Sequence, residues 1–305
     1  MSFFAPPPQL AARVHTRLPD AYRTPRQNEW TRVNAQGRAI HSLLEGPAFD
    51  AQGHLYVVDV PFGRVFRIDP AGQWTLVTEY DGWPNGLKVR ADGSLLITDY
   101  KRGLLSVDPA SGQVQPLFER YLSEGFKGLN DLYLTRSGDV YFTDQGQSGL
   151  QDPTGRVYRL SAQGTLTLFA QGIPSPNGLV VDEERQLLYV AVTRAQQIWR
   201  YPLHDNGQTS KVGVFANLHG GPGGPDGITL DADGGLLVAH AGFGAVWHFD
   251  RWAQPQLRID SPAGRIVTNL AWSKAEPGAL FITEAEDACI LRADLPAPLL
   301  SLIHI

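Results

Sequence analysis

Short apolar runs recur along this chain, and six of them open with a polar residue. The fourth run, for example, reads Pro176-Asn177-Gly178-Leu179-Val180. The six opening positions are Glu45, Asn85, Asn130, Asn177, Asp226 and Thr268. They stand 40, 45, 47, 49 and 42 residues apart. A repeat of this period is typical of propeller blades with four strands each. The pattern therefore predicts an all-β fold, a six-bladed β-propeller with four-stranded antiparallel blades around a central channel.

Each repeat continues on the same plan. Turn signals such as Ala91-Asp92-Gly93 follow the inner runs, and an Asp-Gly pair between two apolar runs indicates a hairpin. Second runs that are apolar on both faces follow at 55–58, 95–98, 140–143, 188–191, 236–239 and 280–283. Third runs alternate, as at 64–68, 156–160 and 198–201, and fourth runs are more polar, as at 74–77 and 165–169. This gradient from apolar to mixed is what the radial stacking of blades requires.

Residues 1–35 stand outside the repeat, and we expect the propeller to occupy residues 36–305. Pro6, Pro7 and Pro8 cannot pair in a sheet interior, so the first segment is predicted to be an extended arm, with one strand at 13–18. No amphipathic helix of useful length is expected. The outer strand of the last blade could come from 299–303 or from a segment before Glu45, such as 30–33. The sequence leaves both open.

Composition excludes several classes of partner. The chain has 305 residues, a formal net charge of −5 and one cysteine, Cys289. Without a basic stripe, neither nucleic acid nor an anionic membrane is an expected partner. A single cysteine excludes an intramolecular disulfide framework, and no stretch is apolar for the roughly 18 residues of a membrane span. The first residues do not read as a secretory signal. We expect a soluble, cytoplasmic protein that is a monomer or a weak homo-oligomer.

The opening positions are the candidates for chemistry, because the inner strands of a propeller begin at one mouth of the channel. Two carboxylates, three amides and one hydroxyl would meet there, and these hard oxygen donors suit calcium, magnesium or manganese. An Asn or Asp before Gly is also a common turn residue, so each copy alone has a structural explanation. However, a turn does not need Glu45. Buried like charges at Glu45 and Asp226 would also be unfavourable without a cation or a proton between them.

Loops at the same mouth supply candidate substrate-binding residues. They are Trp83, Asn85, Phe126, Lys127, Gln145, Arg194, His219 and His240, with Tyr100 and Lys101 as further wall residues. The alternative for each is ordinary packing at a loop surface. Three aspartates end second strands too regularly to form one site, so we interpret Asp59, Asp99 and Asp144 as acceptors for backbone N–H groups. Four other residues are interpreted as structural or surface residues: His54, His204, His248 and Cys289.

The phrases at four of these positions resemble those of the gluconolactonase and senescence-marker-protein (regucalcin) family. They are Glu45-Gly46-Pro47, Leu129-Asn130-Asp131-Leu132, Pro176-Asn177-Gly178-Leu179 and Pro225-Asp226-Gly227. The resemblance covers roughly residues 36–305. It implies a six-bladed propeller with a divalent ion, usually calcium, held in the channel by Glu45, Asn130, Asn177 and Asp226. It also implies hydrolysis of sugar lactones, with Asp226 as the general base.

Two positions depart from the family pattern. Some sugar-lactonase members have a substrate-gripping Arg where this chain has Gly128, with Lys127 beside it, and Asn85 is an amide that many members lack. These departures concern the substrate and not the cation. We therefore expect one divalent cation, with calcium first and magnesium, manganese, zinc or iron(II) as alternatives. The expected partner is a small-molecule lactone.

Two other functions remain open at this point. Hydrolysis of organophosphate esters, as in the diisopropyl fluorophosphatases, would use the same cation position, so a substrate screen is needed to separate it from lactone hydrolysis. A non-catalytic binding propeller would use the cation for structure alone. In that case, removal of the metal would lower the melting temperature while no hydrolytic assay responded.

Overall fold

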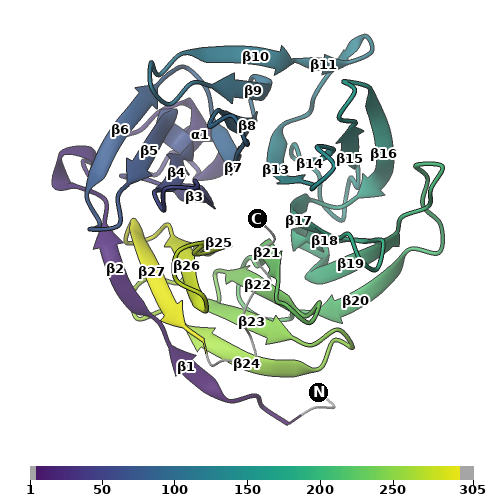
Figure 1. Cartoon of the computed structure of the whole chain (residues 1–305). Coiled ribbons are helices and arrows are strands. Elements are labelled where there is room, and N and C mark those ends of the chain that lie inside the picture. The colour runs from purple at the N-terminus through teal and green to yellow at the C-terminus, as the bar shows by residue number, and fades with distance from the viewer. Residues whose placement is uncertain (1–4, 296–305) are drawn as a thin grey trace.

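The computed structural model describes residues 5–295 of the chain, and its β-strands form six blades around a common axis (Figure 1). The innermost strands are β3 (Leu44–Phe49), β7 (Pro84–Val89), β13 (Leu129–Leu134), β17 (Pro176–Asp182), β21 (Gly224–Leu230) and β25 (Val267–Trp272). The second strands are β4 (Leu55–Asp59), β8 (Leu95–Asp99), β14 (Val140–Asp144), β18 (Leu187–Val192), β22 (Leu236–Ala241) and β26 (Ala279–Glu284). The strands pair antiparallel within each blade, as predicted.

Outside these pairs lie the more polar strands. The third strands are β5 (Arg64–Ile68), β9 (Gly103–Val107), β15 (Gly155–Leu160), β19 (Gln197–Pro202), β23 (Ala245–Phe249) and β27 (Cys289–Asp294). The outer strands of the first five blades are β6 (Trp74–Glu79), β10 (Val114–Phe118), β16 (Leu166–Ile173), β20 (Gly213–Asn217) and β24 (Pro255–Asp260). Strands β11 (Arg120–Tyr121) and β12 (Glu124–Gly125) form a small separate hairpin. The predicted six-bladed propeller is confirmed.

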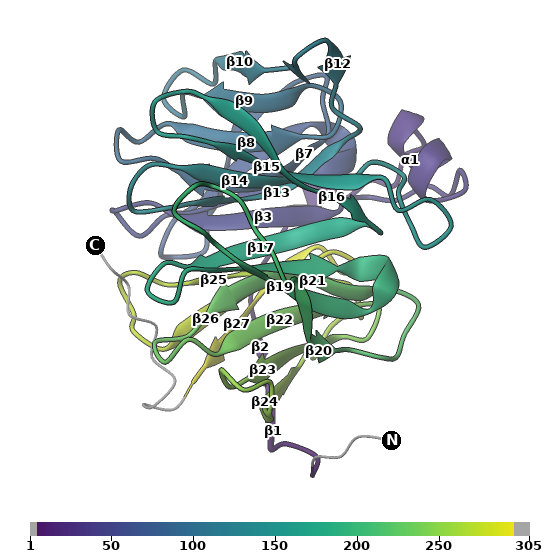
Figure 2. The ribbon, with the colours of Figure 1, turned by 90° about the vertical axis from the view of Figure 1, so that its right-hand side faces the viewer.

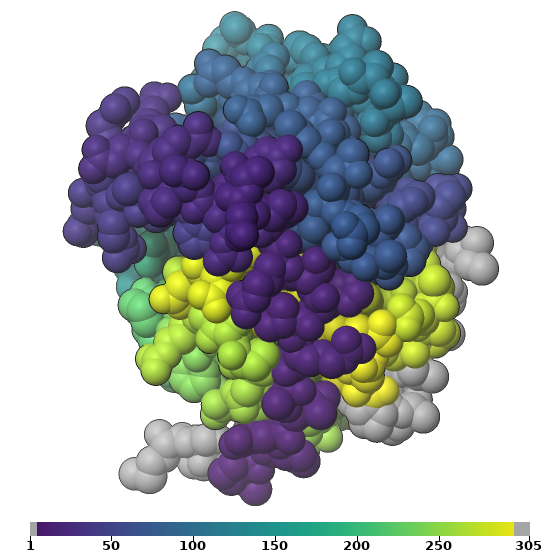
Figure 3. Space-filling view, turned by 90° about the vertical axis from the view of Figure 1, so that its left-hand side faces the viewer, coloured from purple at the N-terminus to yellow at the C-terminus, as the bar shows by residue number. Residues whose placement is uncertain are grey.

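The N-terminal segment closes the ring. Strand β2 (Arg13–Arg17) pairs antiparallel with β27 as the outer strand of the sixth blade, and β1 (Gln9–Ala11) adds a parallel fifth strand to the blade before it. Figure 3 shows this purple segment lying across the yellow blade. The strand expected at 13–18 is thus present, and it provides the closure. Residues 30–33 are helical instead, and 299–303 lie outside the described residues. The proposed domain boundary at residue 35 stays a prediction, although the preceding segment supplies strands to two blades.

A short helix, α1 (Glu29–Asn34), interrupts the arm where no helix was expected. Asn28 caps it, because its Oδ1 accepts from the Thr31 N–H at 2.9 Å and its own N–H donates to Thr31 Oγ1 at 2.9 Å. Such a capping box can nucleate a single turn that periodicity does not reveal. The helix stands at one face of the ring (Figure 2). No helix in the described residues is long and apolar enough to cross a membrane.

The core lies between neighbouring blades rather than at the centre of the ring. Val58 of β4, Leu87 of β7 and Ile97 of β8, for example, belong to one buried cluster. The second strands are therefore apolar on both faces, since each face packs against a different neighbouring blade. Burying a side chain of this size contributes about 1.5–3 kcal/mol. Cys289 is fully buried in a similar cluster, which agrees with its structural interpretation.

The aspartates at the ends of second strands hold backbone N–H groups, as predicted. Asp59 accepts from the Leu43 N–H, Asp99 from the N–H groups of the next turn, and Asp144 from the Gly128 N–H at 2.8 Å. Each carboxylate therefore fixes a loop at the mouth where the inner strands begin.

Candidate metal and active site

All six inner strands break register at the same point. In β13, for instance, the pairing with β14 shifts between Leu129 and Leu132, around Asn130. Equivalent shifts occur around the opening positions of β7, β17, β21 and β25, and in β3 the shift begins at Glu45 itself. A bulge redirects the side chain of the extra residue. The opening positions are therefore aimed by a local backbone feature that is repeated in every blade.

Buried threonines of the second strands support these bulges. Thr143 Oγ1 accepts from the Asp131 N–H at 3.0 Å and donates to the Asn177 carbonyl of the next blade at 2.8 Å. Thr98 does the same for Gly86 N–H and the Asn130 carbonyl. Each of these hydroxyls thus satisfies a freed backbone donor and joins two blades beside the opening positions.

The opening positions meet in one cavity of about 170 Å³. It is lined by Glu45, Asn85, Asn130, Asn177, Asp226 and Thr268, with Trp30 and Asn34 of α1, Leu43, Val60, Tyr100, Gln145 and Ile266. The convergence expected from the repeat is present. Neither α1 residue was expected at this mouth, since the helix itself was not.

A second layer lies beside the first, one residue further along each strand. Four of its members are Gly46, Gly86, Gly178 and Gly227, and the other two are Asp131 and Asn269. Asn269 Nδ2 donates to Glu45 Oε2 at 3.0 Å and to Asp131 Oδ2 at 3.2 Å. The glycines leave the necessary room, since a Cβ on Gly227 would lie 2.2 Å from Asn269 Cγ.

This second layer was not among the predicted site residues. The repeat does contain a pattern that could have predicted it. The residue after the opening position is glycine in four blades, and only Asp131 and Asn269 carry a side chain there.

Three carboxyl groups are buried close together at this site. Burial, followed by the nearby charge of Asp131, raises the pKa of Glu45 to about 8. Burial and then the charges of Glu45 and Asp131 raise the pKa of Asp226 well above its ordinary value. Burial also raises the pKa of Asp131, whereas the Lys88 charge lowers it. A dication among these groups would offset both the desolvation and the mutual repulsion.

The residues fit such a cation. Asn130 Oδ1 is buried without a hydrogen-bond partner, while its Nδ2 donates to Gln145 Oε1 at 3.0 Å. A buried acceptor without a donor is costly unless something else approaches it. Within residues 5–295 no group of three His, Cys, Asp or Glu side chains is arranged to hold a metal. A cation here would therefore need amide oxygens as well as carboxylates, which is a donor set typical of calcium.

Comparison with known proteins then gives the family. The SMP-30/Gluconolactonase/LRE-like region matches residues 43–286. The chain belongs to this family. It is 32% identical over 190 residues to a gluconolactonase of Zymomonas mobilis, an alignment that covers 57% of this chain and about half (52%) of that protein. It is 29% identical over 245 residues to the lactonase drp35 of Staphylococcus aureus, covering 77% of this chain and 73% of that protein.

Solved structures agree. A gluconolactonase from Xanthomonas campestris superposes with a TM-score of 0.74 at 27% identity, over 93% of this chain and 97% of that one. A calcium-binding regucalcin from Agrobacterium tumefaciens gives a TM-score of 0.74 at 22% identity, over 96% of each chain, and supports the fold alone. Together the family and the named relatives support an enzyme that hydrolyses lactones.

The predicted wall residues of this family member lie in different surroundings. Asn85 and Gln145 line the cavity, and Arg194 lines an adjoining one. Trp83 is packed in a core cluster and Phe126 packs against a neighbouring one. Neither aromatic residue lines the cavity of the opening positions, so their contact with substrate stays a prediction.

Two of the remaining wall residues are held by neighbouring groups. His240 is buried, its Nε2 lies 2.9 Å from the Gly220 carbonyl oxygen, and burial lowers its pKa. Lys101 forms ion pairs with Glu29 and Asp81. Two are exposed, namely Lys127 and His219.

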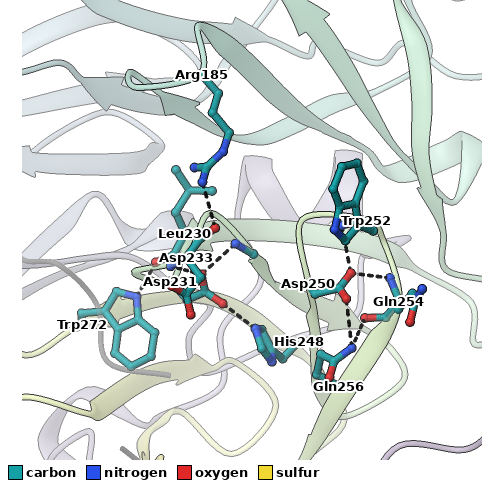
Figure 4. A network of polar contacts seen from close by, with 11 residues as sticks. Arg185, Leu230, Asp231, Asp233, His248, Asp250, Trp252, Gln254, Gln256 and Trp272 are labelled. Carbon is teal, nitrogen blue, oxygen red and sulfur yellow. Dashed lines mark hydrogen bonds and ion pairs between the residues drawn. The ribbon is translucent and has the colours of Figure 1, made fainter. Parts of the chain in front are cut away.

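The opposite ends of the inner strands carry a separate polar network (Figure 4). His248 is buried, and its Nε2 lies 2.6 Å from Asp231 Oδ2. Asp231 also accepts from the N–H groups of Asp233 and Gly235, and Trp272 Nε1 donates to the Leu230 carbonyl at 2.8 Å. These contacts hold the predicted hairpin turn after β21, and they agree with a structural interpretation of His248.

Proposed function

We propose that this protein is a divalent-cation-dependent lactonase that opens a sugar lactone or a similar small lactone. The observation that supports it most is the single buried cavity lined by Glu45, Asn130, Asn177 and Asp226, in which Asn130 Oδ1 has no partner. The relatives named gluconolactonase and lactonase support the reaction class.

The four ligand candidates would hold the cation through oxygen atoms. Calcium suits this set best, with magnesium or manganese next. When bound, the cation polarises the lactone carbonyl and stabilises negative charge on its oxygen in the transition state. Glu45 is suited to remain a ligand, because the Gly46 N–H and Asn269 Nδ2 both donate to its Oε2 and hold it in place.

Asp226 is the proposed general base. A water oxygen bonds to the lactone carbonyl carbon while one water proton passes to the Asp226 carboxylate. The tetrahedral carbon then releases the ring oxygen, which takes up the proton that Asp226 received, so that the product is an open hydroxy acid and the carboxylate is regenerated. Assistance of this kind contributes about 10²–10⁴-fold to the rate. Asp131 is less suited, since its two oxygens are bonded to the Leu132 N–H and Asn269 Nδ2.

Substitution of Asp226 tests this role. Asp226→Asn should stay folded and keep most of its cation, while kcat falls by about 10²–10⁴-fold because the amide cannot accept the proton. Asp233→Asn is the matched control, an exposed aspartate of the turn that follows the same strand, and it should leave kcat unchanged. Near-wild-type turnover of Asp226→Asn would exclude the residue as the base.

Metal removal separates the three functions. A pH-indicator screen with panels of lactones and organophosphate esters, before and after chelation, should show lactone hydrolysis that disappears with chelator and returns with a divalent ion. Hydrolysis unaffected by chelator would exclude the metal mechanism. Faster turnover of organophosphates would favour the second candidate. A lower melting temperature without hydrolysis of either panel would favour a binding propeller.

A further inference from the structure

The cavity of the opening positions has a larger neighbour. A second cavity of about 410 Å³ shares two lining residues, Asn34 and Gln145, with the first. The first alone, at about 170 Å³, is smaller than the roughly 300–1,000 Å³ of most small-molecule sites. A substrate whose lactone ring enters the first cavity therefore finds room for its substituents in the second.

The second cavity is polar. Besides the two shared amides it is lined by Gln147, Gln151, Ser148, Ser175, Arg194 and a few small or apolar residues. Gln145 links the cavities directly, because its Oε1 accepts from Asn130 Nδ2 and its Nε2 donates to Ser175 Oγ at 2.9 Å. A ligand here would meet hydrogen-bonding groups and not an apolar surface.

Arg194 is the only cationic side chain among the described residues that line either cavity. It is exposed, and it forms no hydrogen bond or ion pair within the described part of the chain. The short helix η3 (Thr193–Ala195) fixes its backbone. Thr193 is buried and donates through Oγ1 to the Pro225 carbonyl at 2.8 Å, directly before Asp226. The position of this free guanidinium is thus tied to that of the proposed base.

We infer that the substrate is a lactone with a free carboxylate outside the ring, and that Arg194 binds this carboxylate in the second cavity. The inference rests on the proposed function. A guanidinium fork matches the two oxygens of a carboxylate. Arg194 supplies one positive charge, and it faces a site that already holds the Glu45 and Asp226 carboxylates. This single charge suits a monoanionic substituent better than a phosphate dianion.

A matched pair of substrates tests the inference. The five-membered lactones of D-gluconate and D-glucarate differ in carrying a hydroxymethyl or a carboxylate outside the ring. The wild-type protein should prefer the glucarate lactone in kcat/KM. Arg194→Gln should reduce that preference by about 10–100-fold, since a charge-assisted bidentate contact is lost. Added salt should also narrow the wild-type preference. Arg200→Gln, which removes an exposed charge from β19 of the same blade, should change neither the preference nor the basal rate.

Several results would overturn the inference. These are equal wild-type turnover of both lactones, an equal loss on both in Arg194→Gln, or a clear preference for the corresponding phosphorylated lactone. If neither lactone is hydrolysed, the proposed function fails while the inference is still testable.

Calorimetry should then show tighter binding of D-glucarate than of D-gluconate to the wild-type protein, and this difference in affinity should disappear in Arg194→Gln. Equal affinities would exclude the carboxylate site.

Discussion

The glycine layer beside the opening positions yields the sharpest prediction, at Gly178. A Cβ at this residue would lie 2.3 Å from the Asp226 carbonyl oxygen and 2.7 Å from Gly227 Cα. Both contacts are with the backbone of the next blade, so no side-chain rotation can relieve them. Gly178→Ala should therefore push β21 away from β17, and the Asp226 backbone must move with it.

The size of the effect follows from the distances. Ordinary contacts begin at 3.4 Å, so the strand must retreat by about 1 Å. Overpacking of this kind costs about 1–3 kcal/mol of unfolding free energy. The same displacement carries the Asp226 carboxylate away from the Asn177 side chain, which hydrogen-bonds to it. Since a misplacement of about 1 Å can cost about 100-fold in rate, turnover and cation affinity should fall more than stability alone suggests.

Urea unfolding and calorimetric titration with calcium measure both consequences. Gly213→Ala is the control in the outer strand β20 of the same blade, where an added Cβ meets no atom within 4 Å. It should leave cation binding unchanged and could raise stability by up to about 1 kcal/mol. If Gly178→Ala unfolds at the wild-type urea concentration and binds calcium equally well, the close packing of the two blades does not position Asp226.

Three further predictions concern neighbouring groups. Asn269→Asp replaces the donor between Glu45 and Asp131 by a fourth buried carboxyl group, so the unfolding free energy should fall by about 1–3 kcal/mol; an unchanged urea midpoint would contradict this. Asn28→Ala removes the cap of α1 and should destabilise this helix by about 1 kcal/mol. Because Trp30 and Asn34 of α1 line the cavity, steady-state kinetics should show a rise in KM that is larger than the fall in kcat. Burial raises the pKa of Asp59 to about 6, so the folded state binds this proton more tightly than the unfolded chain. As the pH rises from about 4 to about 7, the free energy of unfolding of the wild-type protein should therefore fall by about 3 kcal/mol relative to that of Asp59→Asn. The same pH dependence of the unfolding free energy in both proteins would refute this prediction.

The blades could be predicted because their pattern has a simple physical cause. A second strand such as β4 is buried on both faces between neighbouring blades, so it must be apolar throughout, and it repeats with the period of the blade. The opening positions could be predicted for the same reason, as each occupies one place in a repeated unit. Loop aromatics offered no such rule. Trp83 and Phe126 have the same local sequence character whether they face a ligand or a core, and only their long-range neighbours distinguish the two cases.

Ring closure was beyond the sequence because it depends on contacts between the two ends of the chain. Arg13 of β2 pairs with Arg292 of β27, and no local signal identifies which polar segment will complete the last blade. Several segments have suitable alternation, and the choice is made by the space that the other five blades leave. An edge strand needs little beyond an exposed, mixed pattern, so its partner is weakly specified locally.

Closure and the site are connected through the same segment. Between β2 and α1 the chain passes Tyr22, whose ring lies 5.0 Å from that of Phe66 in the first blade. This short path takes the N-terminal segment from the last blade, across the seam, to the mouth of the channel. Trp30 and Asn34 can line the cavity only when α1 is held there. The strand that closes the propeller therefore also delivers part of the wall of its candidate active site, so loss of β2 should open the ring and the site together.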